Sequence, residues 1–381
     1  LMLAVFVSVS VGLFAQETTS EIQGTITSGT QKLAGAMITA THKPTNTVYK
    51  TTTREDGRYN LPNLKIGGPY SLTVSYVGYK NESQDDIVLE VGQSFKQNFS
   101  LVASSTSLKD VIVKSTNDKI FNNNHTGSQE LITRNQLEQL PTINRSIQDF
   151  VKLEPTANGL NIGGRSNQYN NMTVDGANFN NSFGLSSVLG GQTGAQPISL
   201  EAIEQIQVNV SPYDIKQGGF AGTGINTVTK SGTNQFKGSV YTYQKNQDYQ
   251  GYNVGPTTLT KTPFKYSIKG ASLGGPIIKN KVFFYISAEQ VRQDAPATSL
   301  SASDANHAPG GNYSQANADT LAALASFLKT KFNYDPGAFQ GYSFQTNSDK
   351  VTAKLDWNIN AKNTFTIKYN YCLLYTSDAA D

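Results

Sequence analysis

The sequence is poor in the residues that build disulfides, metal sites and charged surfaces. It contains a single cysteine, Cys372, so neither an internal disulfide nor a cysteine-type metal site can form. Its three histidines, His42, His125 and His307, lie far apart and lack the spacing of a ligand set. Charged residues make up 15% of the chain and the net charge is +3, which gives no reason to expect nucleic acid as a partner. We therefore expect no metal and no other cofactor.

Catalytic motifs are also lacking. The sequence has no G-x-S-x-G, no H-E-x-x-H and no Walker pattern. Gly222-Thr223-Gly224 is the beginning of a dinucleotide-binding pattern, but no β-α-β unit follows it. The sequence therefore predicts a protein that is not an enzyme.

The sequence contains no hydrophobic run long enough to span a membrane as a helix, and its one marked apolar segment lies at the beginning of the chain. Residues 3–14 are apolar and end at Leu13-Phe14-Ala15, before Gln16. This run is shorter than the ~20 residues that a membrane-spanning helix needs. It predicts a signal peptide over residues 1–15 whose basic n-region is missing, since the chain starts at Leu1. A buried N-terminal strand is the alternative.

Glycine, tyrosine and phenylalanine are abundant, with 33, 19 and 18 copies, and this composition suits strands and turns. Residues 18–103 are expected to form one domain, in which residues 21–102 alternate at period two between turn signals such as Asp56-Gly57. The strands expected here are Glu21–Ile26, Ala36–His42, Thr47–Thr52, Tyr70–Val77, Ile87–Val91 and Ser94–Leu101. Short strands at this spacing predict a small β-sandwich.

The segment Thr53–Tyr79, TREDGRYNLPNLKIGGPYSLTVSYVGY, resembles the carboxypeptidase regulatory-like domain, a transthyretin-like β-sandwich. The resemblance implies an accessory module. No zinc-binding His/Glu set accompanies it, so we interpret Asp56 as a turn residue rather than a catalytic acid.

Residues 125–232 have mixed helix and strand patterns. Short helices are expected at Arg134–Pro141, Arg145–Leu153 and Leu200–Ile206, followed by a strand at Gln207–Val210. This part predicts an α+β domain.

Residues 235–371 have the pattern of membrane strands. Apolar and polar side chains alternate in residues 351–359 and 364–371, and less cleanly in 282–289. Short turns at 279–281 and 360–363 contrast with long polar connections at about 246–261 and 292–348, where residues 318–332 are expected to form a helix. Such strands, with one apolar and one polar face, are typical of an outer-membrane barrel. About five strands are expected, against about 22 in a plugged transporter.

The junction Ser199–Gly238, SLEAIEQIQVNVSPYDIKQGGFAGTGINTVTKSGTNQFKG, stands directly before these strands. It resembles the passage from plug to barrel in TonB-dependent outer-membrane receptors, especially the Oar-like receptors of Bacteroidetes-type bacteria. The resemblance implies a mostly β chain: a transthyretin-like β-sandwich, then an α+β plug domain, then the first strands of a transmembrane β-barrel.

The same resemblance implies roles for particular plug residues. Ile162-Gly163-Gly164-Arg165 and Met172-Thr173-Val174-Asp175-Gly176 match the paired plug strands and turn of the family. Arg165, Glu201 and Glu204 are expected inside the barrel, against its polar wall, where buried charge is paired or hydrated. There they would hold the plug in place or, alternatively, contact cargo.

Residues 104–124 are rich in Ser, Lys and Asn and predict a linker. Within it, Asp110, Val111, Ile112 and Val113 form a short β-prone run whose position resembles that of the TonB box. An extended segment of this kind can add as a strand to the sheet of a partner. The alternatives are a final strand of the sandwich, a first strand of the plug, or a TonB box at Glu17–Gln23.

The resemblance implies uptake of an external ligand across the outer membrane of a Gram-negative bacterium, with the β-sandwich in the periplasm. The implied partners are TonB with its inner-membrane energising complex, outer-membrane lipid and an unidentified extracellular ligand. The alternative is a surface binding or adhesion protein without transport. A peptidase, suggested only by the name of the sandwich family, is a more distant alternative.

The C-terminal residues 372–381, CLLYTSDAAD, break the alternation that runs through Tyr371. They resemble the translation of a transposon-end adapter used in sequencing libraries. We therefore expect a non-native tail that includes Cys372, and the alternative is a genuine terminal segment. The underlying nucleotide sequence would decide between the two.

Overall fold

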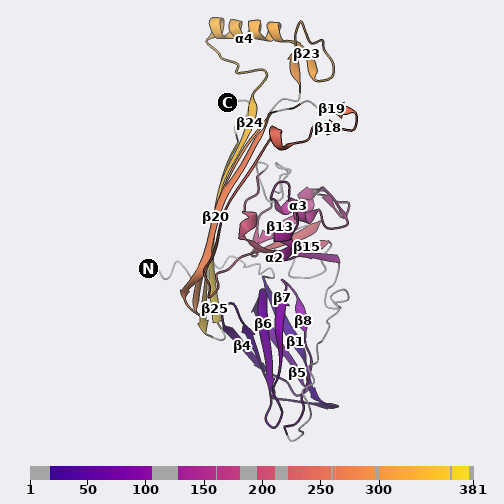
Figure 1. Ribbon diagram of the computed structural model, residues 1–381, viewed down its shortest axis with the longest axis vertical. Coiled ribbons are helices and arrows are strands. Elements are labelled where there is room, and N and C mark those ends of the chain that lie inside the picture. Colours follow the sequence, from indigo (N-terminus) through magenta and orange to yellow (C-terminus); the bar gives the residue numbers. More distant parts are fainter. Residues whose placement is uncertain are drawn as a thin grey trace. The chain divides into compact units, whose positions relative to one another are not determined.

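The computed structural model of the chain, drawn in Figure 1, contains β-sheets in every part and a few short helices. It describes residues 18–104, 128–159, 161–180, 195–210, 222–258, 261, 263–296, 300–360 and 363–376. The expected signal peptide and the TonB-box candidate Asp110–Val113 lie outside these residues.

The chain divides into two compact units. The first comprises residues 1–239, 272–287 and 351–371, and the second comprises residues 240–271, 288–350 and 372–381. The described helices include none that is long and apolar enough to cross a bilayer.

The β-sandwich consists of two sheets. One has the order β2-β1-β5, with β8 and β9 also pairing with β1, and the other has the order β4-β3-β6-β7. The strands are β1 (Thr19–Ser28), β2 (Gln31–Lys32), β3 (Met37–His42), β4 (Thr47–Thr52), β5 (Arg58–Lys65), β6 (Gly67–Ser75), β7 (Glu82–Leu89), β8 (Ser94–Lys96) and β9 (Phe99–Ser100). Buried residues alternate with less buried ones in β1 and β6, and Ile22, Leu72 and Tyr70 lie in the shared core.

The period-two pattern predicted most strands of this domain, but it omitted β2 and β5 and joined β8 and β9 into one strand. β4 has the expected bounds, and Gly57 has a φ of 74°, as its turn requires. Of the two omitted strands, β5 contains Pro62 and a residue with positive φ, Asn63 at 58°, and both features are more typical of a loop than of a strand. The segment considered as a second TonB-box position overlaps β1, which is already paired with β5 and β8, so it offers no free strand.

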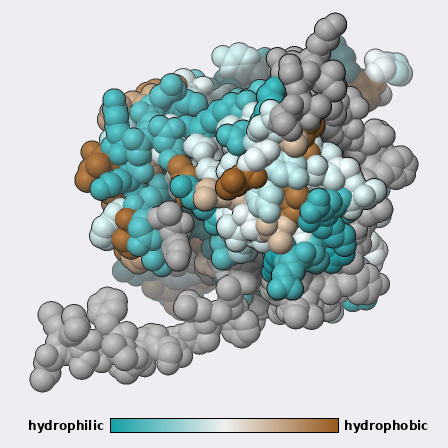
Figure 2. All heavy atoms as spheres, turned by 90° about the horizontal axis from the view of Figure 1, so that it is seen from below, coloured by the Kyte–Doolittle hydropathy of each residue, from teal (hydrophilic) through white to brown (hydrophobic). Residues whose placement is uncertain are grey.

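Hydrophilic residues predominate on the face shown in Figure 2. Hydrophobic residues that are visible there form small separate patches. Where described residues are visible, this face therefore carries no continuous apolar surface.

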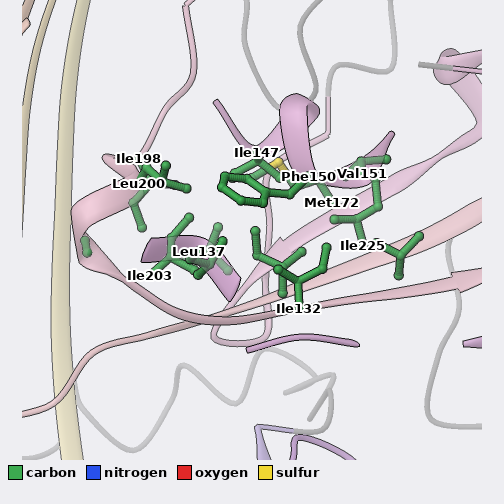
Figure 3. Packing of buried hydrophobic residues seen from close by; sticks show 14 of the residues in the cluster. Ile132, Leu137, Ile147, Phe150, Val151, Met172, Ile198, Leu200, Ile203 and Ile225 are labelled. Carbon is green, nitrogen blue, oxygen red and sulfur yellow. The ribbon is translucent and has the colours of Figure 1, made fainter. Parts of the chain in front are cut away.

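The α+β domain, which we call the plug domain after the expectation from the sequence, contains a mixed sheet of order β10-β15-β16-β13-β14 and a separate hairpin, β11-β12. Its elements are β10 (Ser128–Ile132), α2 (Arg134–Gln139), α3 (Ile147–Val151), β11 (Ala157–Asn158), β12 (Asn161–Ile162), η1 (Asn167–Tyr169), β13 (Asn171–Val174), β14 (Ala177–Asn178), η2 (Leu200–Ala202), β15 (Ile203–Val210) and β16 (Thr223–Thr229). Capping boxes start both α-helices, Thr133 with Gln136 and Ser146 with Asp149. Phe150, Ile147 and Val151 of α3 pack with Ile132, Leu137 and Ile225 from the strands and α2 (Figure 3).

Two expectations for the plug domain were wrong in detail. Residues 200–206 are not a helix: the short 3-10 helix η2 ends at Ala202, and Ile203 begins β15. The β-branched residues of β15 pair on both sides, with β10 and β16, and this pairing outweighs the helical spacing. The segments at Ile162 and Met172 do not pair with each other, because β12 pairs with β11 while β13 pairs with β14 and β16.

The barrel strands form one sheet of order β17-β20-β21-β24-β25. Their bounds are β17 (Lys237–Asn246), β20 (Lys265–Ile278), β21 (Val282–Pro296), β24 (Ser343–Asn360) and β25 (Asn363–Thr376). The long connections contain η3 (Gln247–Tyr249), β18 (Asn253–Val254), β19 (Thr257–Thr258), β22 (Ser301–Ser303), β23 (Tyr313–Asn317) and α4 (Ala318–Phe332). α4 has the expected bounds, and β25 continues beyond Tyr371 to Thr376.

The two faces of these strands differ as the alternation predicted. Val351, Trp357 and Ile359 of β24 are exposed, whereas Thr352 and Asp356 on its other face are buried. The aromatic residues Phe365, Tyr369 and Tyr371 of β25 are exposed as well. The polar face is therefore the covered one, as a barrel wall requires.

Candidate functional site

The turn between β13 and β14 presents a carboxylate to the polar face of the barrel strands. Asp175 and Gly176 occupy this turn with φ of 45° and 85°, values that a tight hairpin favours. The amide of Thr229 donates to Asp175 Oδ1 at 2.7 Å, and the Thr229 hydroxyl donates to Oδ2. Thr229 ends β16, the parallel neighbour of β13, so the plug sheet itself fixes the direction of the carboxylate.

Two lysines of the barrel approach the same carboxylate. Lys368 Nζ on β25 lies 2.7 Å from Asp175 Oδ2, and Lys354 Nζ on β24 lies 3.9 Å from it. The side chains of all three residues are less than 15% exposed. Lys354 also donates to the Thr229 carbonyl at 3.2 Å. Plug and barrel are thus joined here by buried, charge-assisted hydrogen bonds.

Burial raises the pKa of Asp175, but attraction to Lys354 and Lys368 and the Lys368 and Thr229 hydrogen bonds outweigh it. The pKa of Asp175 therefore lies below its ordinary value, and the carboxylate is ionised at neutral pH. An ionised carboxylate beside two lysine side chains is suited to anchorage.

Glu201 is the centre of a second group of charges. Its Oε1 accepts from Lys230 Nζ at 2.7 Å, from the Ser239 hydroxyl at 3.2 Å and from Arg134 at 3.4 Å. Arg145 lies 3.9 Å from Oε2. The Tyr285 hydroxyl on β21 donates to the Glu201 carbonyl at 3.1 Å. Ser239 and Tyr285 belong to barrel strands, so this group also joins plug and barrel.

Burial affects the pKa of both residues in the Glu201–Lys230 ion pair. It raises the pKa of Glu201, but hydrogen bonds and attraction from Lys230 and Arg134 outweigh it and bring that pKa below its ordinary value. The pKa of Lys230 is lowered, because burial and the nearby Arg134 outweigh the effect of Glu201. The pair has therefore lost much of its hydration, and removing one partner is costly.

The other predicted residues lie elsewhere. Gly163 and Gly164 have φ of 60° and 75°, so they form a turn that only glycine adopts readily. Arg165 follows them with an exposed side chain, and no ion pair of Arg165 is found in the described ranges, so the structure does not bring it to Glu201. Glu204 is half-buried and lies beside Gly67 of the sandwich.

Sequence reasoning missed the basic half of the site. Lys354 and Lys368 were recognised only as polar members of alternating strands, and Lys230 had no motif around it. Lys354 and Lys368 share one signal, an inward-facing lysine on a barrel strand, which requires a carboxylate opposite it. Which carboxylate it meets depends on the plug fold.

These residues line one cavity of about 770 Å³. Its wall includes Asp175, Glu201, Lys354, Lys368 and Tyr285. No group of three or more His, Cys, Asp or Glu side chains placed to hold a metal ion is found among the described residues. The arrangement can hold the plug by charge.

Comparisons with known proteins agree with this architecture. The carboxypeptidase regulatory-like domain matches residues 21–102, and the outer membrane beta barrel domain matches residues 228–379. The TonB-dependent transporter Oar of Myxococcus xanthus is 27% identical over 291 residues, which are 71% of this chain and 26% of that protein. The chain thus spans about a quarter of the length of this relative.

Two solved structures are similar at lower identity. The siderophore receptor PirA from Acinetobacter baumannii has a TM-score of 0.44 and 18% identity, covering 68% of this chain and 33% of the receptor. A mutant of the ferric enterobactin receptor from Pseudomonas aeruginosa, in complex with enterobactin, has a TM-score of 0.43 and 13% identity, covering 65% and 33%.

The strands and the family match define an outer-membrane β-barrel protein that carries an N-terminal carboxypeptidase regulatory-like domain. More specifically, the chain is a homologue of the TonB-dependent transporter Oar, and its location is the outer membrane.

Proposed function

We propose that the full-length protein takes up an external ligand into the periplasm in a TonB-dependent cycle. The observation that carries this proposal is the attachment of a folded plug sheet to the inner face of the barrel strands, through Asp175 with Lys368 and through Glu201 with Ser239. A protein that only adheres needs a barrel and an outer surface, but it does not need a separate domain held by charges inside the barrel.

The anchorage suits reversible displacement. Ion pairs and hydrogen bonds on a polar wall can be exchanged for water when the plug moves, whereas a continuous apolar interface would have to expose its surface to water. TonB would supply the work by pulling a segment on the N-terminal side of the plug, and the β-sandwich would lie in the periplasm beside it.

We place the TonB contact at Asp110, Val111, Ile112 and Val113. An extended run of this kind adds to the edge of a sheet through main-chain hydrogen bonds, with little dependence on its side chains. Its only other suggested position, Glu17–Gln23, has lost support because β1 begins at Thr19 and is paired on both sides.

The test compares Ile112→Pro with Ile112→Val in the full-length protein. The Pro variant lacks one backbone donor and should lose most of its binding to the periplasmic domain of TonB, measured by calorimetry. The Val variant should bind as the wild type does, because the backbone is unchanged. Equal binding by the Pro variant would place the contact elsewhere.

Deletion of residues 110–113 separates transport from adhesion. Because the deletion leaves the barrel intact, an adhesion protein should keep its attachment to a surface, while a TonB-dependent transporter should lose uptake. Uptake that persists at the wild-type rate after the deletion would contradict the proposed energy coupling.

A further inference from the structure

The plug strand β15 holds the backbone of the β-sandwich with two glutamine side chains. Gln205 Oε1 accepts from the Val91 amide at 3.1 Å, and Gln205 Nε2 donates to the Leu89 carbonyl at 3.4 Å. Gln207 Nε2 donates to the Val91 carbonyl at 3.3 Å. Gln205 and Gln207 lie on the same face of β15 because side chains alternate along a strand. Both glutamines are buried, so the hydrogen bonds of their amides are made within the protein, and among the described residues only Gln207 Oε1 of these four amide atoms has no partner.

A small apolar cluster surrounds these hydrogen bonds. Ile66 and Val91 of the sandwich pack with Val228 of β16, and Leu131 of β10 packs against them. Val91 is fully buried and Val228 is 4% exposed. Amides that satisfy a buried backbone beside an apolar cluster make a specific contact between sandwich and plug, since an unmatched partner would leave polar groups unpaired.

The same sandwich also contacts the barrel. Lys65 Nζ at the end of β5 lies 3.3 Å from Asp356 Oδ2 on the polar face of β24. Two positions further along β24, Asn358 donates from Nδ2 to the Thr47 hydroxyl at 2.8 Å. Asp356 is 11% exposed, and Thr366 of β25 donates to its other oxygen at 2.8 Å.

We propose that the β-sandwich is a lock that bridges plug and barrel on the periplasmic side. One body that contacts both β15 and β24 resists any movement of the plug relative to the barrel, because the movement must break one set of contacts. The sandwich must therefore separate from at least one of them before the plug is displaced. This inference rests on the proposed function only in that the plug moves during transport.

A reversible cross-link tests whether the lock exists. Thr47→Cys and Asn358→Cys, in a Cys372→Ser background, place two thiols where the native side chains are in hydrogen-bond contact. Oxidation of the full-length protein in detergent should join them, and the single-cysteine variants are the controls. Failure of the pair to form a disulfide, while the protein remains folded, would show that the sandwich is not seated on β24.

The displacement of the plug can be measured in the absence of a transported ligand and of TonB. The probe is the potassium chloride conductance of the protein in a planar lipid bilayer as urea is added on the periplasmic side. The oxidised pair should open at least about tenfold less often than the same protein after reduction. Equal opening in the two states would overturn the lock, whatever ligand the protein transports.

Loosening the lock should have the opposite effect. Gln205→Leu with Gln207→Leu leaves the Val91 amide and carbonyl without their partners and should raise opening about threefold to tenfold. Lys65→Met acts from the barrel side and should raise it too, which covers the case that the double variant does not fold. Gln139→Leu, at an exposed position of α2, is the matched control and should leave opening unchanged. Opening at the wild-type frequency in both folded variants would contradict the proposal.

The conductance measurement requires neither a transported ligand nor TonB. The proposed lock can therefore be refuted independently of the proposed TonB-dependent uptake. A protein that never imports a ligand can still show the cross-link and its effect on conductance. A TonB-dependent importer in which the cross-link changes nothing would keep its function and lose the lock.

Discussion

Lys368 on β25 donates a 2.7 Å hydrogen bond to Asp175, which precedes it by 193 residues. The contact joins the first hairpin of the plug sheet to the last described strand of the barrel sheet. Lys354 Nζ lies 3.9 Å from the same oxygen of Asp175. One carboxylate of the plug thus interacts with two lysines of the barrel strands.

Asp175→Asn should loosen the plug. The amide keeps the size of the side chain but removes the carboxylate that pairs with Lys368 and attracts Lys354, and breaking a buried pair from one side costs about 3 kcal/mol. Hydrogen exchange of the β13 and β14 amides in the full-length protein should therefore become faster. The Asp175→Asn, Lys368→Met double variant should lose less stability than the two single variants lose together, because the two residues interact directly.

Asp86→Asn is the matched control. Asp86 pairs with Lys43 in the sandwich, but its side chain is 82% exposed, so this pair is screened by water. The exchange of β13 and β14 should not change in that variant. Unaltered exchange after Asp175→Asn as well would show that the plug is held elsewhere, for instance through Glu201.

The secondary structure could be predicted from the sequence where a segment fitted only one periodic pattern. β4 and α4 have their expected bounds, since the alternation of β4 and the helical spacing of α4 are uninterrupted. Residues 200–206 were wrongly predicted to be a helix, because Leu200 and Ile203 also have helical spacing. The strand from Ile203 onward forms because β15 pairs on both sides. Such long-range pairing cannot be read from a local window.

Of the charged residues in the site, only the acidic ones were predicted from the sequence. The resemblance led to Asp175 and Glu201, and the structure gives both of them cationic partners. It also led to Arg165, which is exposed. Lys230, Lys354 and Lys368 were missed because their roles depend on which strand lies opposite which turn, a property of the tertiary fold.

Gly57→Val should destabilise the β-sandwich, measured by the melting temperature of the isolated fragment 18–104. Gly57 has a φ of 74°, and a Cβ there would lie 2.9 Å from the Ile26 carbonyl oxygen. Strain at positive φ and this clash together should cost about 2 kcal/mol or more. Gly29→Val isolates the effect of φ, because Gly29 has a φ of 58° and nothing within 4 Å of its Cβ position. A larger loss for Gly29→Val would refute the clash.

Phe150→Ala should disrupt the plug core shown in Figure 3. Phe150 is 1% exposed and packs among Ile147, Ile132 and Ile225, so truncation leaves a cavity that costs about 3–5 kcal/mol. Protease sensitivity of the plug in the full-length protein should rise accordingly. Ile143→Ala, at a position that is 78% exposed, should cost less than about 0.5 kcal/mol. Equal sensitivity of the two variants would mean that α3 does not close this core.

The stability of the isolated sandwich should fall with acid because of His42. This histidine is 4% exposed, its Nδ1 lies 2.6 Å from the Thr45 hydroxyl oxygen, and its ring centroid lies 4.8 Å from that of Tyr70. Burial and, to a lesser extent, the charge of Lys65 lower the pKa of His42 to about 3. In the unfolded chain the ordinary pKa of histidine is about 6.5.

The pH dependence of stability is set by the state of the protein that binds the proton. As the pH falls below about 6.5 the unfolded chain takes up a proton, while folded His42 stays neutral down to about pH 3. The free energy of unfolding should therefore decrease by up to about 1.4 kcal/mol per pH unit between these values. His42 is the only histidine in residues 18–104, so His42→Gln should remove this dependence above about pH 5, where carboxylates contribute little. Urea unfolding at pH 7, 6 and 5 measures it, and parallel curves for wild type and variant would show that His42 carries a proton in the fold.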